Sequence, residues 1–164
     1  MTACVLLVSE VRGATPRATH GRSFNGVTAN FEITNPLIKK GEDLKLVVVY
    51  HNAGPRAVTF RFFPAEEDAK LYRKGESKPI IGGFVGEPAF EEIIIRSGES
   101  FRLEEVFYTR GWPDLAPGDY ELRFFYNLRL LFDGSLIKRY EANYPHEGPL
   151  VPWSDRAYGF RVQE

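Results

Sequence analysis

The sequence lacks the features that would place it in several protein classes. It has a single cysteine, Cys4, so an intramolecular disulfide cannot form. Its 21 basic and 22 acidic side chains leave a formal net charge of -1, which provides no overall field to attract a polyanion. No apolar run approaches the roughly 20 residues that would span a bilayer. We therefore expect neither nucleic acid nor a membrane among its partners.

The first residues, MTACVLLVSEVRG, look only briefly like a secretion signal. No basic residue precedes the apolar run, and the run breaks at Ser9 and Glu10. This pattern predicts a strand, with Cys4 as a small buried hydrophobic residue rather than a nucleophile. We expect a cytoplasmic protein.

Motifs that carry catalytic or metal chemistry are also scarce. The three histidines, His20, His51 and His146, do not have the close spacing of a local zinc site. Adjacent glutamates such as Glu104 and Glu105 would point to opposite faces of a strand, so they cannot form the paired carboxylates of a glycosidase. Neither a phosphate loop nor a nucleophile elbow is present. We predict no catalytic residue, no metal ligand and no cofactor, although histidines distant in sequence could still meet in space.

What the sequence does have is period-two alternation of apolar residues, which is typical of half-buried strands. With 164 residues, 43% of them hydrophobic and 26% charged, the chain is expected to form one domain. The inward positions are predicted as follows: Val27, Ala29, Phe31 and Ile33; Leu44, Leu46, Val48 and Tyr50; Val58, Phe60 and Phe62; Tyr120, Leu122, Phe124 and Tyr126; Tyr158, Phe160 and Val162. Shorter strands are expected near residues 70–73 and 93–95. The pattern predicts an all-β antiparallel sandwich of roughly seven to nine strands.

Two local patterns predict interruptions of this regularity. Alternation holds for Phe101 and Leu103 and then restarts one residue late at Val106, which indicates a β-bulge at Glu104 and Glu105. Further along, the dipeptide at residues 133–134 is Asp-Gly between apolar runs, and this favours a type I′ hairpin over a helix.

The turn-and-strand order resembles that of prokaryotic immunoglobulin-like sandwich domains. The segments that carry the resemblance are KKGEDLKLVVVYHN, VTFRFF, IIIRSGESFRLEEVF and LAPGDYELRF, within about residues 37–126. The arrangement is similar to that of the bacterial intracellular proteinase inhibitor family, which is not enzymatic. The resemblance implies a β-sandwich and an inhibitor-like role. Tyr120 resembles the tyrosine of the corner found in such folds, whose hydroxyl bonds to the preceding turn.

The single domain, residues 1–164, is expected to have four parts. Residues 1–26 form an N-terminal strand and loop, 27–126 the sandwich core, and 156–164 the last strand. Between them, residues 127–155 form a long hairpin or loop excursion before the last strand. This excursion exceeds what a minimal sandwich requires.

Aromatic residues are abundant, at 14% of the chain, and some do not fit the inward positions. Val47, Val49, Phe63 and Phe125 lie at outward positions, and Trp112, Tyr144 and Trp153 lie in loops rich in Pro and Gly. Either the excursion covers the outward apolar residues, with Trp153 as a plug, or they form an exposed interaction patch. The candidate binding residues are Trp112, Phe125, Tyr144, His146 and Trp153.

These residues support two functions from different classes, with a hydrolase as a weaker third. The first is a non-enzymatic interaction domain that recognises an unknown protein partner or associates with itself. The second is a module that binds carbohydrate or another small ligand, with Trp112, Tyr144 and Trp153 as stacking platforms.

Overall fold

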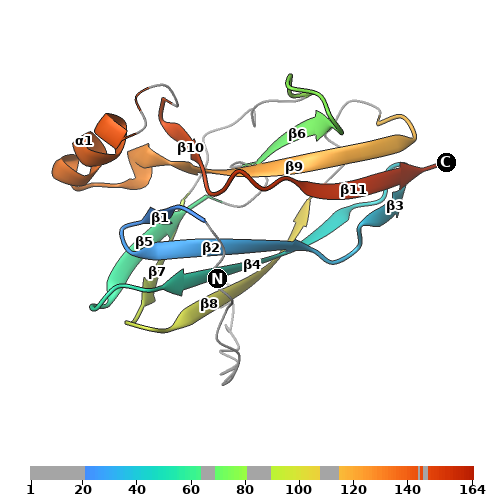
Figure 1. Ribbon diagram of the computed structural model, residues 1–164. Coiled ribbons are helices and arrows are strands. Elements are labelled where there is room, and N and C mark those ends of the chain that lie inside the picture. Colours follow the sequence, from blue (N-terminus) through green and yellow to red (C-terminus); the bar gives the residue numbers. More distant parts are fainter. Residues whose placement is uncertain (1–20, 64–68, 81–89, 108–114, 144, 146–147) are drawn as a thin grey trace, which may run out of the picture.

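The fold is a sandwich of β-sheets, seen in a computed structural model that describes residues 21–63, 69–80, 90–107, 115–143, 145 and 148–164 (Figure 1). One sheet has the strand order β1 (Ser23–Phe24), β2 (Val27–Ile33), β4 (Leu44–Asn52) and β8 (Ser100–Phe107). The other has the order β10 (Leu150–Pro152), β9 (Gly118–Asn127), β11 (Tyr158–Gln163) and β3 (Leu37–Lys39), and β6 (Ala69–Arg73) also pairs with β9. A third pair joins β5 (Val58–Phe62) to β7 (Glu91–Ile95).

The pairing is antiparallel throughout the described strands except between β11 and β3, which run parallel. The predicted all-β antiparallel sandwich is confirmed. The predicted strand number was too low, since the described residues form eleven strands. The extra strands are short ones such as β1, β3 and β10, which have only two or three residues each and carry little alternation.

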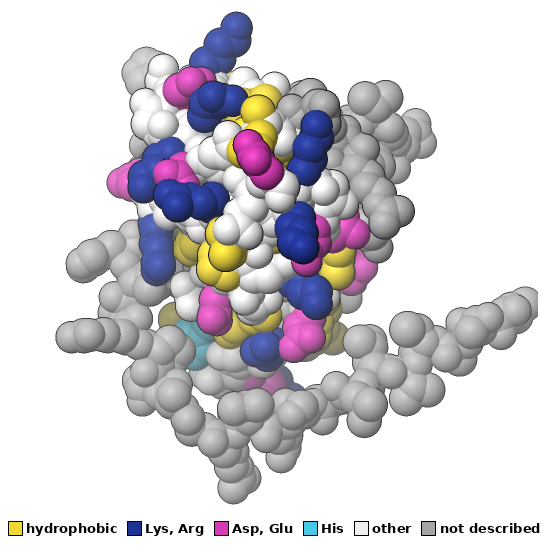
Figure 2. All heavy atoms as spheres, turned by 90° about the vertical axis from the view of Figure 1, so that its right-hand side faces the viewer, with side chains coloured by type: hydrophobic (Ala, Val, Ile, Leu, Met, Phe, Trp, Pro, Cys, Tyr) yellow, Lys and Arg dark blue, Asp and Glu magenta, His cyan; other side chains and the backbone are white. Residues whose placement is uncertain are grey.

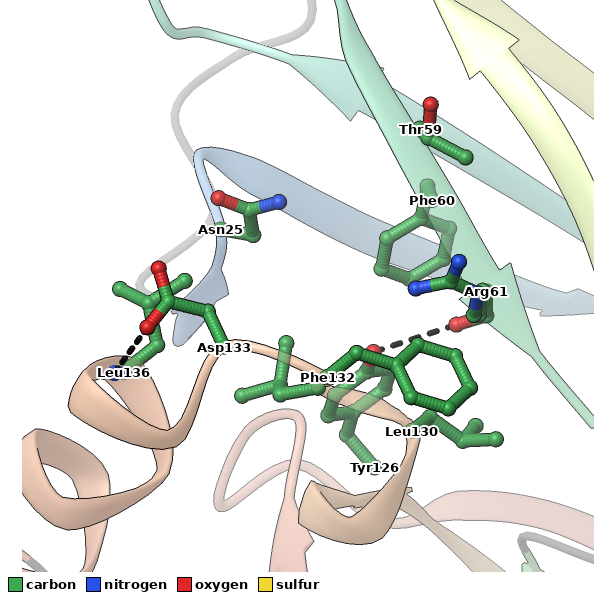
Figure 3. A pocket seen from close by; sticks show the side chains of 10 residues that line it. Asn25, Thr59, Phe60, Arg61, Tyr126, Leu130, Phe132, Asp133 and Leu136 are labelled. Carbon is green, nitrogen blue, oxygen red and sulfur yellow. Dashed lines mark hydrogen bonds between the residues drawn. The ribbon is translucent and has the colours of Figure 1, made fainter.

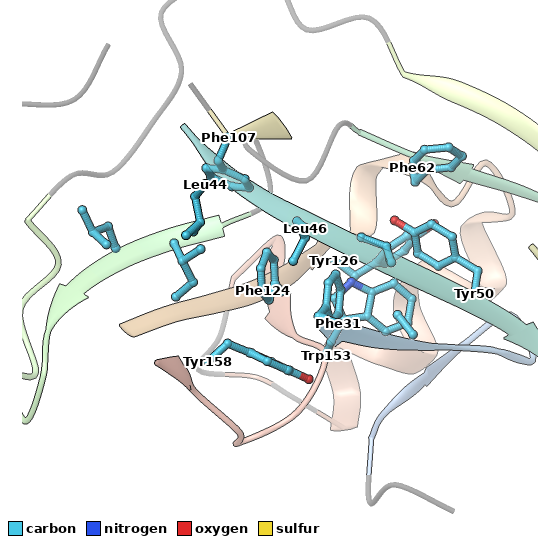
Figure 4. Packing of buried hydrophobic residues seen from close by; sticks show 14 of the residues in the cluster. Phe31, Leu44, Leu46, Tyr50, Phe62, Phe107, Phe124, Tyr126, Trp153 and Tyr158 are labelled. Carbon is cyan, nitrogen blue, oxygen red and sulfur yellow. The ribbon is translucent and has the colours of Figure 1, made fainter. Parts of the chain in front are cut away.

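The core lies between the two larger sheets, where their inward side chains meet (Figure 4). Phe31 of β2 stacks on Phe124 of β9, with ring centroids 4.1 Å apart and planes 2° from parallel. The inward positions predicted on β2, β4, β5, β9 and β11 are buried, except that Ile33 and Val58 are only partly so. Each fully buried large side chain stabilises the fold by about 1.5–3 kcal/mol, so this shared layer holds the sheets together.

A tight hairpin that the sequence reasoning missed joins β1 to β2. Asn25 and Gly26 have positive φ angles of 51° and 82°, as a type I′ turn requires, and Asn-Gly is the strongest short-range signal for that turn. Phe24, completely buried, faces Val27 across the turn. The segment 1–26 therefore contributes a strand at its end, while residues 1–20, including the predicted strand around Val5, lie outside the described residues.

A buried asparagine ties the end of β4 to its surroundings. Asn52 is completely buried, and its Nδ2 donates to the carbonyls of Arg56 at 2.8 Å and Ile95 at 2.9 Å. Its Oδ1 accepts from the backbone N–H of Gly54 at 2.8 Å. Because the amide is satisfied on both sides, the turn after β4 and the end of β7 are held in one place.

The β-bulge predicted at Glu104 and Glu105 was wrong. β8 pairs with β4 in unbroken one-to-one register from Ser100 to Phe107. Glu105 therefore takes a half-buried inward position opposite Leu46, and Val106 is left 41% exposed. A continuous ladder keeps the β8 backbone groups that face β4 hydrogen-bonded, and this outweighs the burial of one valine at a sheet edge.

The hairpin predicted at Asp133-Gly134 was also wrong, because Asp133 starts a helix. Its Oδ1 accepts hydrogen bonds from Ser135 N at 2.9 Å, Ser135 Oγ at 2.6 Å and Leu136 N at 3.4 Å, as an N-cap does. The helix α1 spans Gly134–Asn143, where the glycine lies in the first turn rather than in the interior. Before it, the 3₁₀ helix η2 (Leu128–Leu130) replaces the expected strand.

The corner predicted at Tyr120 is present. The Tyr120 hydroxyl donates to the carbonyl of Ala116 at 2.6 Å, and its ring is buried and stacked with Phe160. This bond fixes the turn that leads into β9, so the opening of that strand serves as scaffold.

Candidate functional site

The predicted binding residues do not form a single site in the described structure. Trp112, Tyr144 and His146 lie outside the described residues. Phe125 and Trp153 are described, but they lie on different sides of the second sheet. Phe125 and Trp153 therefore do not form a common binding surface.

Trp153 belongs to the core. Its side chain is 3% exposed and contacts Phe24 and Tyr126, with ring centroids 4.8 and 5.3 Å away. Figure 4 shows it among inward-facing rings. A stacking or hot-spot residue needs an exposed face, and Trp153 presents none. Of the two alternatives, a plug or an exposed binding residue, the structure thus favours the plug. Trp153 fills the space between the sheets, however, and does not cover Phe125 and the outward valines.

Phe125 lies on the outer face of β9, half-buried. The Lys70 ammonium on the neighbouring strand β6 stands 4.7 Å from its ring centroid. Two residues before Phe125 on β9, the Arg123 guanidinium lies 4.3 Å from the ring of Tyr72. The other outward apolar residues are also covered to different degrees: Val47 is buried, and Val49 and Phe63 are half-buried. Lys70 and Arg123 therefore cover aromatic rings on the outer face of β6 and β9.

Exposed apolar side chains gather elsewhere, on the outer face of β5 and β7. Phe132, Phe90 and Ile94 are 62%, 45% and 75% exposed. The ring of Phe90, just before β7, meets that of Phe132 at a centroid distance of 6.0 Å. The register pairs Ile94 with Thr59, and Glu92 with Arg61. We call this surface the β5–β7 patch; it comprises Thr59, Arg61, Phe90, Glu92, Ile94 and Phe132.

Arg61 organises this patch. Its guanidinium carbon lies 3.6 Å from the centre of the Phe132 ring, close enough for a strong cation–π contact. Its Nε donates to Glu92 Oε2 at 2.6 Å across the strand pair. Phe132 is therefore held in a fixed orientation although most of its surface faces solvent.

A small cavity opens beside the patch, between β5, the β1–β2 turn and the start of α1 (Figure 3). Its volume is about 120 Å³. The apolar wall consists of Phe60, Tyr126, Leu130, Leu131 and Leu136, and the polar groups come from Asn25, Thr59, Arg61 and Asp133. Figure 3 shows Arg61 and Asp133 on opposite sides of this space.

The carboxyl group of Asp133 stays ionised at neutral pH. The hydrogen bond from the Ser135 hydroxyl, followed by those from the Ser135 and Leu136 backbone N–H groups, holds its pKa below the ordinary value. One of its oxygens, Oδ1, accepts all of these bonds. The cavity thus has a fixed negative charge at the helix start.

The helix and the hairpin that border the cavity are bonded to each other. The Tyr140 hydroxyl of α1 accepts from the backbone N–H of Asn25 at 2.9 Å and donates to the carbonyl of Ser23 at 3.1 Å. The Tyr126 hydroxyl donates to the carbonyl of Arg61 at 3.2 Å, which joins β9 to β5. These bonds make the cavity part of the scaffold.

Elsewhere, His51 Nδ1 lies 3.0 Å from Ser100 Oγ across β4 and β8. This histidine contacts a serine on an open strand surface, and among the described residues no carboxylate hydrogen-bonds its ring. In the part of the chain that the structure describes, no three His, Cys, Asp or Glu side chains lie close enough together to hold a metal ion.

The charge on the surface is mixed. The end of the sandwich that carries β3 and the C-terminus shows Lys and Arg side chains interspersed with Asp and Glu (Figure 2). Arg161 and Asp119 form one such pair, with contacts of 2.6 and 3.0 Å. Of the described helices, none has the length and apolar character needed to cross a bilayer.

Comparisons with known proteins give limited guidance. No protein-family model and no curated protein sequence matches the chain. The solved structures that match include a β-glucosidase from Listeria innocua in complex with glucose, with 14% identity, a TM-score of 0.47, and coverage of 88% of this chain and 17% of that one. A β-glucosidase from Erythrobacter marinus has 13% identity, a TM-score of 0.46, and coverage of 87% and 16%.

This chain therefore spans 17% and 16% of the lengths of those two enzymes. Likeness at this level does not indicate what the chain does.

The sequence held one signal for the β5–β7 patch that the strand reasoning did not use. Arg61 takes an outward position on a strand whose inward residues the alternation identifies, and Glu92 directly precedes the apolar run expected at residues 93–95. Their pairing, and the approach of Phe132 from the excursion, depend on the tertiary fold. A hairpin at residues 133–134 would place Phe132 in a strand, and its exposure does not follow from that pattern.

Proposed function

We propose that this chain is a non-enzymatic binding domain that recognises another protein through the β5–β7 patch. The observation that carries the proposal is the exposure of three large apolar side chains, Phe90, Ile94 and Phe132, on one surface. Monomeric proteins scatter such residues singly, whereas grouped ones mark interaction sites. The proposal keeps the cytoplasmic location expected from the sequence.

The composition of the patch suits protein recognition. Aromatic residues and arginine are enriched at interface cores and among hot spots. Phe132 and Arg61 form such a pair, and the ion pair with Glu92 offsets part of the cost of desolvating the guanidinium. An apolar surface on the partner would complement this arrangement.

The patch also rests on a rigid base, which lowers the entropic cost of binding. The inward residues of the same strand pair, Phe60, Phe62 and Ile95, are 2% exposed or less. Asn52 fixes the end of β7 through its bond to Ile95. The outward side chains therefore keep their relative positions when the protein is free.

The carbohydrate alternative has less support. Its three platforms were Trp112, Tyr144 and Trp153, and the last is enclosed in the core. The other two lie outside the described residues. Protein recognition is the function that the exposed side chains support best.

Photo-crosslinking tests this proposal. A benzophenone amino acid replaces Phe132 in the full chain, expressed in its native host, and a second version carries it at Leu37, which is 54% exposed on β3. We expect a discrete protein adduct from position 132 that disappears when Ile94→Asp is added. An adduct with the mass of two chains would identify the partner as a second copy. Absence of an adduct at position 132, or the same adduct from position 37, would overturn the proposal.

A further inference from the structure

The cavity beside the β5–β7 patch has opposite charges on its two sides. Arg61 contributes a positively charged guanidinium. Asp133 contributes a carboxylate, anchored at the first turn of α1. A ligand group between them meets a cation on one side and an anion on the other (Figure 3).

Both charged groups have hydrogen-bonding capacity left. Asp133 Oδ1 accepts the three capping bonds, while Oδ2 accepts none from the described residues. Arg61 uses Nε for Glu92, and within the described structure its two terminal nitrogens make no hydrogen bond. The Asn25 side chain, which also lines the cavity, has no hydrogen-bond partner among the described residues either.

Charge complementarity restricts what can bind. An anionic group would face the Asp133 carboxylate, and a cationic group would face the Arg61 guanidinium, so each meets a repulsive side. A purely apolar group would desolvate both charges without giving them a partner. The group that fits is neutral and carries a donor at one end and an acceptor at the other.

The size of the cavity restricts the ligand further. The cavity of about 120 Å³ is well below the roughly 300–1,000 Å³ of pockets that enclose whole small ligands. This is space for one side chain that projects from a larger partner.

We propose that the cavity receives the side-chain carboxamide of a glutamine residue on the partner protein. A carboxamide has a carbonyl oxygen that accepts from the Arg61 terminal nitrogens and an NH₂ group that donates to Asp133 Oδ2. The methylene groups of glutamine lie against the apolar wall of Phe60, Leu130 and Leu136. The inference rests on the proposed function, because it takes the occupant to be part of a protein that covers the adjoining patch.

A titration with small probes tests the inference on the full chain. The probe is N-acetylglutamine methylamide, added to isotope-labelled protein up to about 100 mM, a range suited to the weak binding of a single side chain. We expect saturable shifts of the backbone amide signals of Thr59, Arg61 and Leu136. The corresponding glutamate and lysine compounds, and glucose, are expected to bind at least about tenfold more weakly, because each leaves a charge unmatched or exceeds the space.

Two variants link the binding to the proposed groups. Arg61→Gln and Asp133→Asn should each weaken the glutamine probe about tenfold or more, since each removes one charge-assisted hydrogen bond. Asp133→Asn keeps the helix cap, because asparagine caps helices as well as aspartate does. The matched controls are Arg102→Gln, from an exposed arginine paired with Glu104 at 3.0 Å on β8, and Asp155→Asn, both of which should bind as the unchanged protein does.

Several outcomes would overturn the inference: no saturable shift, equal or tighter binding of the glutamate, lysine or glucose probe, or equal loss in the control variants. The readouts separate it from the proposed function. A crosslinked partner whose binding is insensitive to Arg61→Gln and Asp133→Asn would remove the glutamine site and leave protein recognition standing. Probe binding without any adduct at position 132 would overturn the proposed function and leave only the selectivity of the cavity for a carboxamide.

Discussion

The indole of Trp153 meets the ring of Phe24 edge to face, with centroids 4.8 Å apart and planes at 85°. This contact joins the segment before the last strand to the first described strand. It gives Trp153 a structural role, because both side chains are almost completely buried.

Replacing Trp153 with alanine should therefore destabilise the protein by about 3–5 kcal/mol, the cost of removing a large buried aromatic side chain. Chemical denaturation followed by circular dichroism measures the change. Phe125→Ala is the matched control and should cost less than half as much, since that ring is only half-buried. A loss below about 1 kcal/mol for Trp153→Ala would contradict its placement in the core.

Removing the corner hydroxyl isolates one hydrogen bond. Tyr120→Phe should lower the free energy of unfolding by about 1 kcal/mol or somewhat more, because the carbonyl of Ala116 loses a donor at 2.6 Å. Tyr72→Phe serves as control: Tyr72 is buried, but its hydroxyl makes no hydrogen bond with the described residues. Equal denaturation midpoints for Tyr120→Phe and the unchanged protein would mean that the corner does not contribute.

Asn52 tests the importance of its two donated bonds. In Asn52→Asp a carboxylate replaces the amide, so the carbonyls of Arg56 and Ile95 lose their donor and face a buried negative charge. We expect a loss of about 3–5 kcal/mol at neutral pH, as for other uncompensated buried charges. Protonation of the new carboxyl group should reduce that loss at low pH. Asn30→Asp, at an exposed position of β2, should have little effect, and an equal cost for both variants would argue against a buried clamp.

The N-cap should give α1 a defined pH dependence. The hydrogen bonds from Ser135 and Leu136 lower the pKa of Asp133 in the folded protein below the ordinary value of 3.8 for an aspartate. Its stabilising contribution is therefore complete above the unfolded pKa and is lost as the pH falls through the folded pKa. Asp133→Ala should lower the denaturation midpoint at neutral pH, with a smaller difference between variant and unchanged protein below pH 3.8. A difference that stayed constant across this range would contradict the ionised cap.

The regular strands could be predicted from the sequence because alternation reports directly on burial. Residues 120–126 alternate without interruption, and the core uses the same phase. In β4 the predicted inward residues are also buried, although Val47 between them is buried as well. The exceptions are places where contacts made in the folded protein outweigh the preference of the local sequence. In β8 the hydrogen-bonded register to β4 overrides the apolar phase, so Glu105 points inward and Val106 outward. No local signal distinguishes this arrangement from a bulge.

The structure of the excursion was harder to predict, because the Asp-Gly sequence at residues 133–134 is compatible with two local structures. A type I′ turn needs strands on both sides, whereas an N-cap needs apolar residues at helical spacing beyond it. Leu136, Ile137 and Tyr140 have that spacing, and they pack against the core as a helix face. The candidate site depends on this difference, since Phe132 and Asp133 reach the cavity only when the helix begins there.

The measurement that tests the central claim most directly is the affinity of the crosslinked partner, once purified, for a variant of the patch. Ile94→Ser combined with Phe132→Ser should raise the dissociation constant at least about tenfold, because two exposed apolar side chains lose their contacts. Leu37→Ser combined with Val106→Ser, two exposed apolar residues on other strands, should leave the dissociation constant unchanged. Equal affinities for the patch variant and the unchanged protein would show that the partner binds elsewhere.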